Sequence, residues 1–146
     1  MRKMGLDIGA KNIGVAISDP LCKTSQGLTT VKRSNFSREV RKLKELIENY
    51  QVDEVIVGIP LNLNGSSGPQ TRMVKKYAKK LSSQLELPIK CWDERLTTLS
   101  ARKALLQANV RRAQRKMVID KVAATLILQG YLDSLRRGEG FKSAHS

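Results

Sequence analysis

The chain has 146 residues and carries 27 lysines and arginines against 13 aspartates and glutamates, a formal net charge of +14. This length suits one domain with one core, no stretch reaches the roughly 18 apolar residues that cross a bilayer, and the N-terminus lacks the apolar segment of a secretory signal. The positive surplus favours a polyanionic partner, and an aromatic content of only 4% favours phosphate-backbone contacts over base stacking.

The first half of the chain predicts three strands, a helix and a fourth strand. Apolar runs at 3–8 and 13–18 flank Gly-Ala-Lys-Asn and predict a β-hairpin, and 27–33 predicts a third strand. The nearly continuous apolar run at 53–60 predicts a buried strand. Between them, apolar residues at helical spacing predict an amphipathic helix: Phe36, Val40, Leu43, Ile47 and Tyr50.

The polar loop 61–69 leads to a second helix, for which Ser67 and Pro69 are the expected cap and first-turn residues. A strand at 87–92 follows. The stripe expected to bury the second helix consists of Met73, Tyr77, Leu81 and Leu85.

A third helix is predicted after a cap at Thr97 or Thr98, then a basic connector at 109–116 and a last, apolar helix at about 117–135. We expect one α/β domain over 1–135, a mixed sheet with helices on both faces, and a polar, mobile tail over 136–146. The two cysteines show no zinc or CxxC spacing and are expected to be reduced thiols in a cytoplasmic protein.

Acids at three separated places in this basic chain are candidates for function. Asp7 lies inside the first apolar run, where a turn residue is less expected than a functional one. Asp93 and Glu94 follow the last strand, and spacing alone does not choose between them; Glu94 would also suit the first turn of the next helix. Asp120 shares a helix face with Ala123, Ala124, Ile127 and Tyr131.

A buried carboxylate needs a compensating cation or a raised pKa. For Asp120 the alternatives are an ion pair with Lys116 or Lys121, or a favourable place in the first turn of its helix. If the three acids converge at one edge of the sheet, an all-oxygen pocket would select Mg²⁺ or Mn²⁺. The only histidine, His145, lies in the tail, so chemistry in which metals activate water fits better than a side-chain base.

Four segments together resemble the YqgF/RuvX family: "LDIGAKNIGVAISDP" (6–20), "VGIPLNLNGSSGPQTR" (57–72), "WDERLTTLSA" (92–101) and "IDKVAATLILQGYL" (119–132). The resemblance covers nearly the whole chain. It implies an RNase H-like fold with a mixed sheet of about five strands. It also implies a nuclease: members are described as Holliday junction resolvases and as nucleases that mature the 5′ end of pre-16S rRNA.

The resemblance implies metal-binding catalytic acids at Asp7, Glu94 and Asp120, holding two Mg²⁺ or Mn²⁺ ions. Lys11 and Arg95 match basic positions of the family's motifs, and the loop with Asn62 and Asn64 matches its mobile substrate-side loop. From charge alone, a further phosphate-binding cluster is expected just before the last helix, with a solvated connector as the alternative: Arg111, Arg112, Arg115 and Lys116.

The first hypothesis is therefore a divalent-metal-dependent endonuclease for structured nucleic acid, most consistent with 5′-end processing of pre-16S rRNA in ribosome biogenesis. A Holliday junction resolvase would need two active sites and hence a homodimer, whereas RNA-end maturation would need only a monomer. A non-catalytic RNA-binding assembly factor fits the charge but leaves the acids unexplained. An ATP-binding protein of the actin and sugar-kinase type is disfavoured because one small domain cannot close around a nucleotide.

Overall fold

The computed structural model describes residues 1–62, 64–94 and 112–136, with side chains described from 120 onward in the last of these ranges. The elements are β1 (Arg2–Ile8), β2 (Asn12–Ser18), β3 (Ser25–Lys32), α1 (Phe36–Tyr50), β4 (Val52–Ile59), α2 (Pro69–Leu85), β5 (Ile89–Asp93) and α4 (Arg112–Arg136). The helix predicted after Thr97 or Thr98 and the tail from 137 lie outside the described residues.

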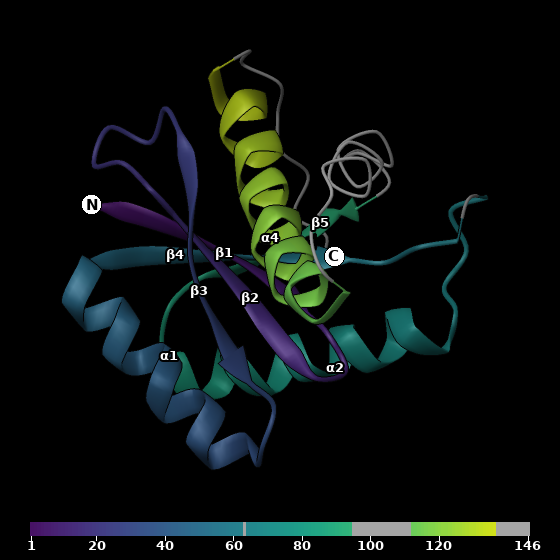
Figure 1. Cartoon of the computed structure of the whole chain (residues 1–146). Coiled ribbons are helices and arrows are strands. Elements are labelled where there is room, and N and C mark those ends of the chain that lie inside the picture. The colour runs from purple at the N-terminus through teal and green to yellow at the C-terminus, as the bar shows by residue number, and fades with distance from the viewer. Residues whose placement is uncertain (63, 95–111, 137–146) are drawn as a thin grey trace.

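The five strands form one sheet in the order β3-β2-β1-β4-β5 (Figure 1). β2 pairs antiparallel with both β1 and β3, whereas β4 runs parallel to β1 and β5. The predicted mixed sheet is confirmed. Because β1, β4 and β5 are parallel, their carboxyl ends meet at one edge of the sheet, where sites in α/β proteins usually form.

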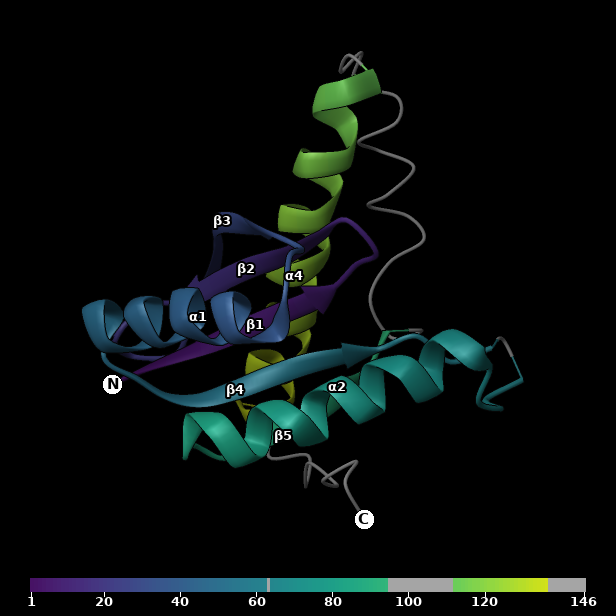
Figure 2. The ribbon, with the colours of Figure 1, turned by 90° about the horizontal axis from the view of Figure 1, so that it is seen from below.

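Helices cover both faces of the sheet, α1 and α2 on one side and α4 on the other (Figures 1 and 2). Strand alternation divides the apolar residues between these two layers. In β1, for example, Met4, Leu6 and Ile8 pack in the core under α1 and α2. The smaller core under α4 contains Ala16, Ile56 and Trp92. Among the described residues, no helix combines the length and apolar character that crossing a membrane requires.

Three local predictions were wrong. α2 is capped by Gly68 rather than Ser67, because the Thr71 hydroxyl accepts a hydrogen bond from the Gly68 amide and donates one to the Pro60 carbonyl. Met73 is 53% exposed, and Val74 and Ala78 join the buried stripe instead. The basic segment predicted as a connector is helical from residue 112 onward.

A buried carboxylate ties α1 to α2 and to the end of β3. Glu39 is 2% exposed and accepts hydrogen bonds from the Tyr77 hydroxyl at 2.6 Å, the Ser34 amide at 2.9 Å and Arg33 Nε at 3.1 Å. Burial raises the Glu39 pKa, but these hydrogen bonds and the Arg33 charge outweigh burial and hold the pKa below its ordinary value. Arg33 also donates to the Gly9 carbonyl at 2.7 Å, which links this cluster to the β1–β2 turn.

We predict that Glu39→Gln lowers the free energy of unfolding by about 2–3 kcal/mol near neutral pH. The substitution removes the buried negative charge that pairs with Arg33 and weakens the hydrogen bond from the Tyr77 hydroxyl. A carboxylate with a lowered folded-state pKa stabilises the fold above its unfolded pKa, and that stability is lost as the pH falls through the folded-state value. The variant should therefore lose less stability on acidification than the parent. Urea unfolding at about pH 7 and about pH 4 measures both effects.

The matched control is Glu48→Gln on the same helix, where the glutamate is exposed. It should change stability by no more than about 0.5 kcal/mol. An equal loss in both variants would contradict the structural role assigned to Glu39.

Candidate active site

Asp7 lies one residue before the end of β1, at the sheet edge shared by the parallel strands. It pairs across the hairpin with Gly14 of β2. Alternation places it on the same face as Gly5, where a β-carbon would lie 2.8 Å from Cβ of Leu128 in α4. The half-buried Asp7 is therefore on the α4 face of the sheet rather than in a turn.

Asp120 reaches the same place from α4. A β-carbon on Gly14 would overlap the Asp120 carbonyl oxygen, so the helix backbone lies directly against the strand residue that pairs with Asp7. The face predicted around Asp120 is buried at Ala123, Ala124 and Ile127. The alternative that Asp120 is a first-turn acid is wrong, because α4 begins eight residues earlier, at Arg112.

Glu94 lies on the β4 side of Asp7, whereas Asp120 lies on the β2 side. The Glu94 Oε1 lies 2.9 Å from the position that a β-carbon on Gly58 of β4 would occupy. Leu6 pairs with Val57, so the next residue of β4, Gly58, comes beside Asp7. Gly14 and Gly58 thus flank Asp7 on its two neighbouring strands, one against the Asp120 backbone and the other against the Glu94 carboxylate.

Asp93 falls on the other face of β5. Trp92 packs in the core under α4, whereas Cys91 packs against the core under α1 and α2. Alternation then gives Asp93 the side of Cys91 and leaves Glu94 on the side of Trp92. Strand register therefore puts Glu94, and not Asp93, on the α4 face of the sheet with Asp7.

A metal site is not preassembled in these side-chain positions. Within the described ranges, no three His, Cys, Asp or Glu side chains lie close enough together to hold one ion. The donor set is nevertheless chemically uniform: three carboxylates on one face of one sheet edge, with neither cysteine nor histidine among them. Such oxygen donors suit Mg²⁺ and Mn²⁺ rather than softer metals.

Asp19 belongs to a different part of the molecule. It follows β2 at the opposite edge of the sheet, and its Oδ1 accepts hydrogen bonds from the amides of Lys23 at 2.7 Å and Thr24 at 2.9 Å. The hydrogen bond from the Thr24 amide is the main cause of its lowered pKa. Asp19 stabilises the β2–β3 turn and is remote from Asp7.

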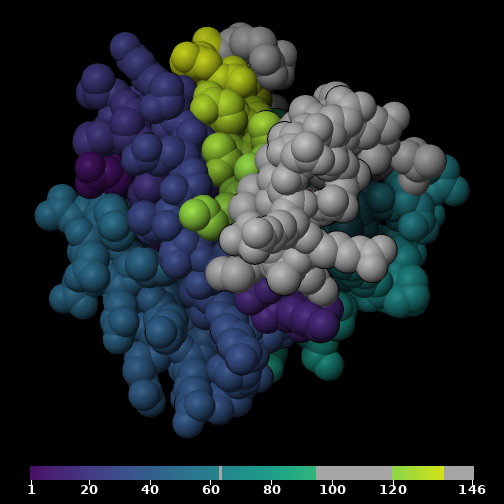
Figure 3. All heavy atoms as spheres, viewed as in Figure 1, coloured from purple at the N-terminus to yellow at the C-terminus, as the bar shows by residue number. Residues whose placement is uncertain are grey.

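The predicted nucleic-acid contacts are only partly described. Lys11 is exposed in the β1–β2 turn, which forms a dark purple patch below the centre of Figure 3. Asn62 donates to the Ser66 hydroxyl at 3.0 Å, and Asn64 accepts from the Ser66 amide at 3.0 Å, so both exposed amides also shape their own loop. Arg95 and Arg111 lie outside the described residues, as do the side chains predicted at Arg112, Arg115 and Lys116.

Sequence reasoning missed the two glycines that let the acids approach the sheet. Each is a glycine inside an apolar strand, a pattern that signals close approach of another group but does not say which group approaches. It also missed Arg33, whose guanidinium holds the Gly9 carbonyl and whose amide donates to the Lys11 carbonyl at 2.9 Å.

The family comparison covers almost the whole chain. Residues 1–134 match the family described as "RuvX: Holliday junction resolvase". The chain belongs to the RuvX family. Relatives named "Putative pre-16S rRNA nuclease" are 51% identical in Clostridium kluyveri, over 94% of this chain and all of that protein, and 54% identical in Moorella thermoacetica, over 92% and 96%.

Solved structures support the same fold for this RuvX-family chain. The Thermus thermophilus RuvC in complex with a Holliday junction substrate superposes with a TM-score of 0.59 at 14% identity, over 95% of this chain and 97% of RuvC. The fowlpox virus Holliday junction resolvase gives a TM-score of 0.53 at 17% identity, over 92% and 99%. At these identities the likeness establishes the RNase H-like fold and no residue roles.

We predict that Gly58→Ala destabilises the fold by about 1–3 kcal/mol, because the new methyl group meets Ile127 and the Glu94 carboxylate together. Thermal unfolding measures the loss, and a crystal structure of the variant should show Glu94 displaced. Gly27→Ala is the control, since its methyl group would lie 3.3 Å or more from side-chain atoms of Thr125 and Lys121. A Gly58→Ala variant as stable as the parent would refute the close packing described here.

Proposed function

We propose that this RuvX-family protein is a divalent-metal-dependent endonuclease that hydrolyses structured RNA, processing the 5′ end of pre-16S rRNA. The observation that carries the proposal is the arrangement around Asp7. Two flanking glycines admit the Asp120 backbone on one side and the Glu94 carboxylate on the other. The names of the relatives support the substrate: the proteins from Clostridium kluyveri and Moorella thermoacetica are both named "Putative pre-16S rRNA nuclease".

In this proposal Asp7, Glu94 and Asp120 hold the metal ions. When bound, such ions supply an activated water and stabilise the leaving oxygen of a phosphodiester. The chain's own residues fix the positions: β1 and β5 bring their carboxylates to the sheet edge, and α4 brings the third across it. The described residues include no histidine, so the oxygen-rich edge is the better candidate for the chemistry than a side-chain base.

Phosphate binding falls to the residues around this edge. Lys11 projects from the turn that follows Asp7, and the Asn62–Asn64 loop follows β4 at the same end of the sheet. Arg95 and the basic residues at 111, 112, 115 and 116 border the acids in sequence and are proposed to hold the backbone on either side of the cut. A monomer suffices for cleavage of an RNA end.

The family description supports one further candidate, the resolution of Holliday junctions. Symmetric cuts in a four-way junction require two active sites, and so a homodimer. The two functions are separated by substrate choice, because the same acids would serve both.

We predict that Asp7→Asn abolishes cleavage of an RNA spanning the 5′ boundary of pre-16S rRNA, lowering the rate at least 100-fold or about 3 kcal/mol in barrier. RNA affinity should stay equal or rise, because a negative charge near phosphates is removed. The assay compares Mg²⁺ or Mn²⁺ with EDTA and offers a four-way DNA junction in parallel.

The matched control is Asp19→Asn, the turn aspartate at the opposite edge of the sheet, which should cleave at the parental rate. Cleavage that survives in Asp7→Asn, or in EDTA, would exclude the proposed site. Cleavage of the junction alone would assign the resolvase function instead, and tight RNA binding with no cleavage by the parent would favour an assembly factor.

A second prediction compares the adjacent acids. Glu94→Gln should lose cleavage as Asp7→Asn does, whereas Asp93→Asn should keep most of it, because register places Asp93 on the other face of β5. Single-turnover cleavage rates at saturating metal measure the difference. The opposite ranking would show that the catalytic acid is Asp93 and that the candidate site lies elsewhere.

A further inference from the structure

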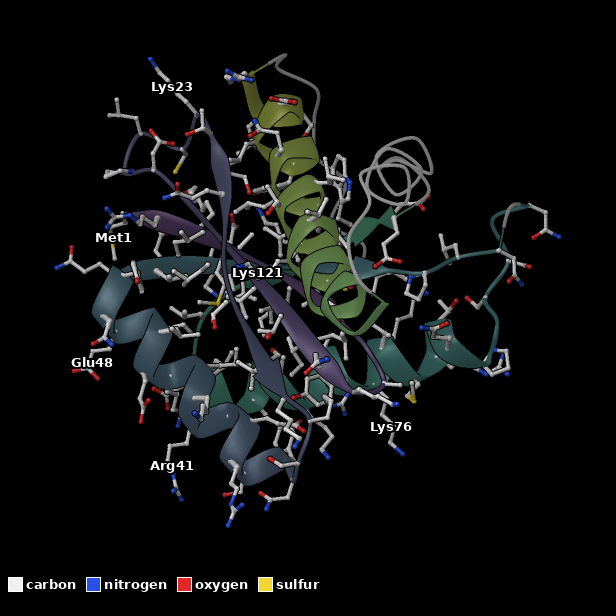
Figure 4. All side chains as sticks on the ribbon, viewed as in Figure 1. Met1, Lys23, Arg41, Glu48, Lys76 and Lys121 are labelled. Atoms are coloured by element: carbon white, nitrogen blue, oxygen red, sulfur yellow. The ribbon has the colours of Figure 1, made fainter. Side chains whose placement is uncertain are left out.

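The exposed face of α2 is strongly and uniformly basic. Five cations recur there at spacings of three, one, three and one, so all lie on one side of the helix: Arg72, Lys75, Lys76, Lys79 and Lys80. The opposite side of α2 is buried along its length, from Thr71 to Leu85. We call these five residues the α2 basic face. Figure 4 shows one of them, Lys76, pointing away from the sheet into solvent.

No acid balances this charge. α2 contains neither aspartate nor glutamate, and among the described residues no ion pair joins any member of the α2 basic face to an acid. Five pairs of like charge lie three or four residues apart, an arrangement that weakens a helix. Arg72 also lies near the positive end of the helix dipole, where a cation is unfavourable. A bound polyanion would reverse both costs.

The α2 basic face begins at the proposed active-site edge. The Thr71 hydroxyl, one residue before Arg72, donates a hydrogen bond to the Pro60 carbonyl, directly after the end of β4. At its far end, the Lys80 ammonium lies 4.2 Å from the ring centroid of Phe36, the first residue of α1. Figure 2 shows α2 running beside β4 from this edge along the helical layer opposite α4.

The length of the face suits a phosphate backbone. From Arg72 to Lys80 the helix rises by about 12 Å, at about 1.5 Å per residue. One strand of a B-form DNA duplex presents a phosphate about every 3.4 Å along its axis, so roughly three or four phosphates of such a strand match this span. The closer stacking of an A-form RNA duplex would fit at least as many phosphates. An anionic membrane is the other polyanion to consider, but the only large apolar side chain that the described residues of α2 expose strongly is Met73.

We propose that the α2 basic face binds the phosphate backbone of the substrate RNA beyond the segment held at the acids. The proposal rests on the proposed function for the identity of the RNA. It adds a second contact region, on the helical layer opposite α4, so that substrate affinity depends on residues that take no part in cleavage.

The test is binding of a fluorescein-labelled RNA duplex to the full chain in EDTA, measured by anisotropy over a series of salt concentrations. Lys76→Gln/Lys79→Gln should lower affinity severalfold at low salt and reduce the slope of log K against log [salt] by about 2, or about 1 per phosphate contact. Glutamine keeps helix propensity and removes like-charge repulsion, so the free variant should melt at an equal or higher temperature.

The matched control is Lys23→Gln/Lys44→Gln, which removes the same charge from exposed lysines of the β2–β3 turn and α1. Figure 4 shows Lys23 far from Lys76. The control should leave the slope unchanged, and an equal fall in both variants, or in neither, would overturn the proposal. Loss of binding to phosphatidylglycerol vesicles with RNA binding intact would also overturn it, in favour of a membrane surface.

The EDTA conditions separate this proposal from the proposed function. If the parent binds RNA through the α2 basic face but never cleaves it when metal is added, the nuclease proposal fails and the binding surface stands. If the parent cleaves RNA and the Lys76→Gln/Lys79→Gln slope equals the parental slope, the binding surface fails and the nuclease stands.

Discussion

The close approach of α4 to the sheet is the constraint on which the candidate site depends. Layers that pack through ordinary side chains stay well apart, about 10 Å in the case of two stacked sheets. Here α4 lies directly against Gly5 and Gly14, with Ala123 and Ala124 on its own contact face, so backbone meets backbone at Asp120. This approach brings the Asp120 backbone beside β2 at the edge where Asp7 and Glu94 lie. The small core of this layer, built around Trp92 and Tyr131, holds the helix there.

A second polar cluster supports the other end of the same layer. Glu54 is 6% exposed, yet it accepts hydrogen bonds from the Tyr131 hydroxyl of α4 at 2.7 Å and pairs with Lys90 at 2.9 Å. A buried carboxylate with these partners is expensive to disturb. α4 is therefore attached to β4 at Tyr131 and lies against Gly14 of β2 at Asp120, about three helical turns apart. These two contacts fix both its position and its rotation about its own axis.

The sequence predicted the elements well because their signals are local. Alternation in β1 and β2 and the apolar period of α1 require no knowledge of the rest of the fold, and the order of strands and helices then implied the mixed sheet.

The predictions that failed depended on tertiary contacts. Ser67 looked like a cap, but the Thr71 hydroxyl reaches Pro60 and moves the cap to Gly68. Residues 112–116 looked like a connector because charge is a poor guide to helix boundaries. Spacing alone did not distinguish Glu94 from Asp93, whereas the register of β5 assigns the two acids to opposite faces of the sheet.

The distribution of acids is compatible with the proposed function, in which a protein of net charge +14 brings phosphates to three carboxylates. Four acids outside the candidate site have cationic partners that neutralise them: Asp53 and Glu54 pair with Lys3, Glu39 with Arg33, and Asp133 with Arg136. These ion pairs reduce the negative contribution to the electrostatic potential at the protein surface, so the surface lysines outside these pairs would dominate the attraction of a polyanion. In the proposed function, affinity and chemistry therefore belong to different residues. Many exposed cations on the helical layers would attract the polyanion, each contributing little, and the three proposed catalytic acids would need only to accept one phosphate at the sheet edge.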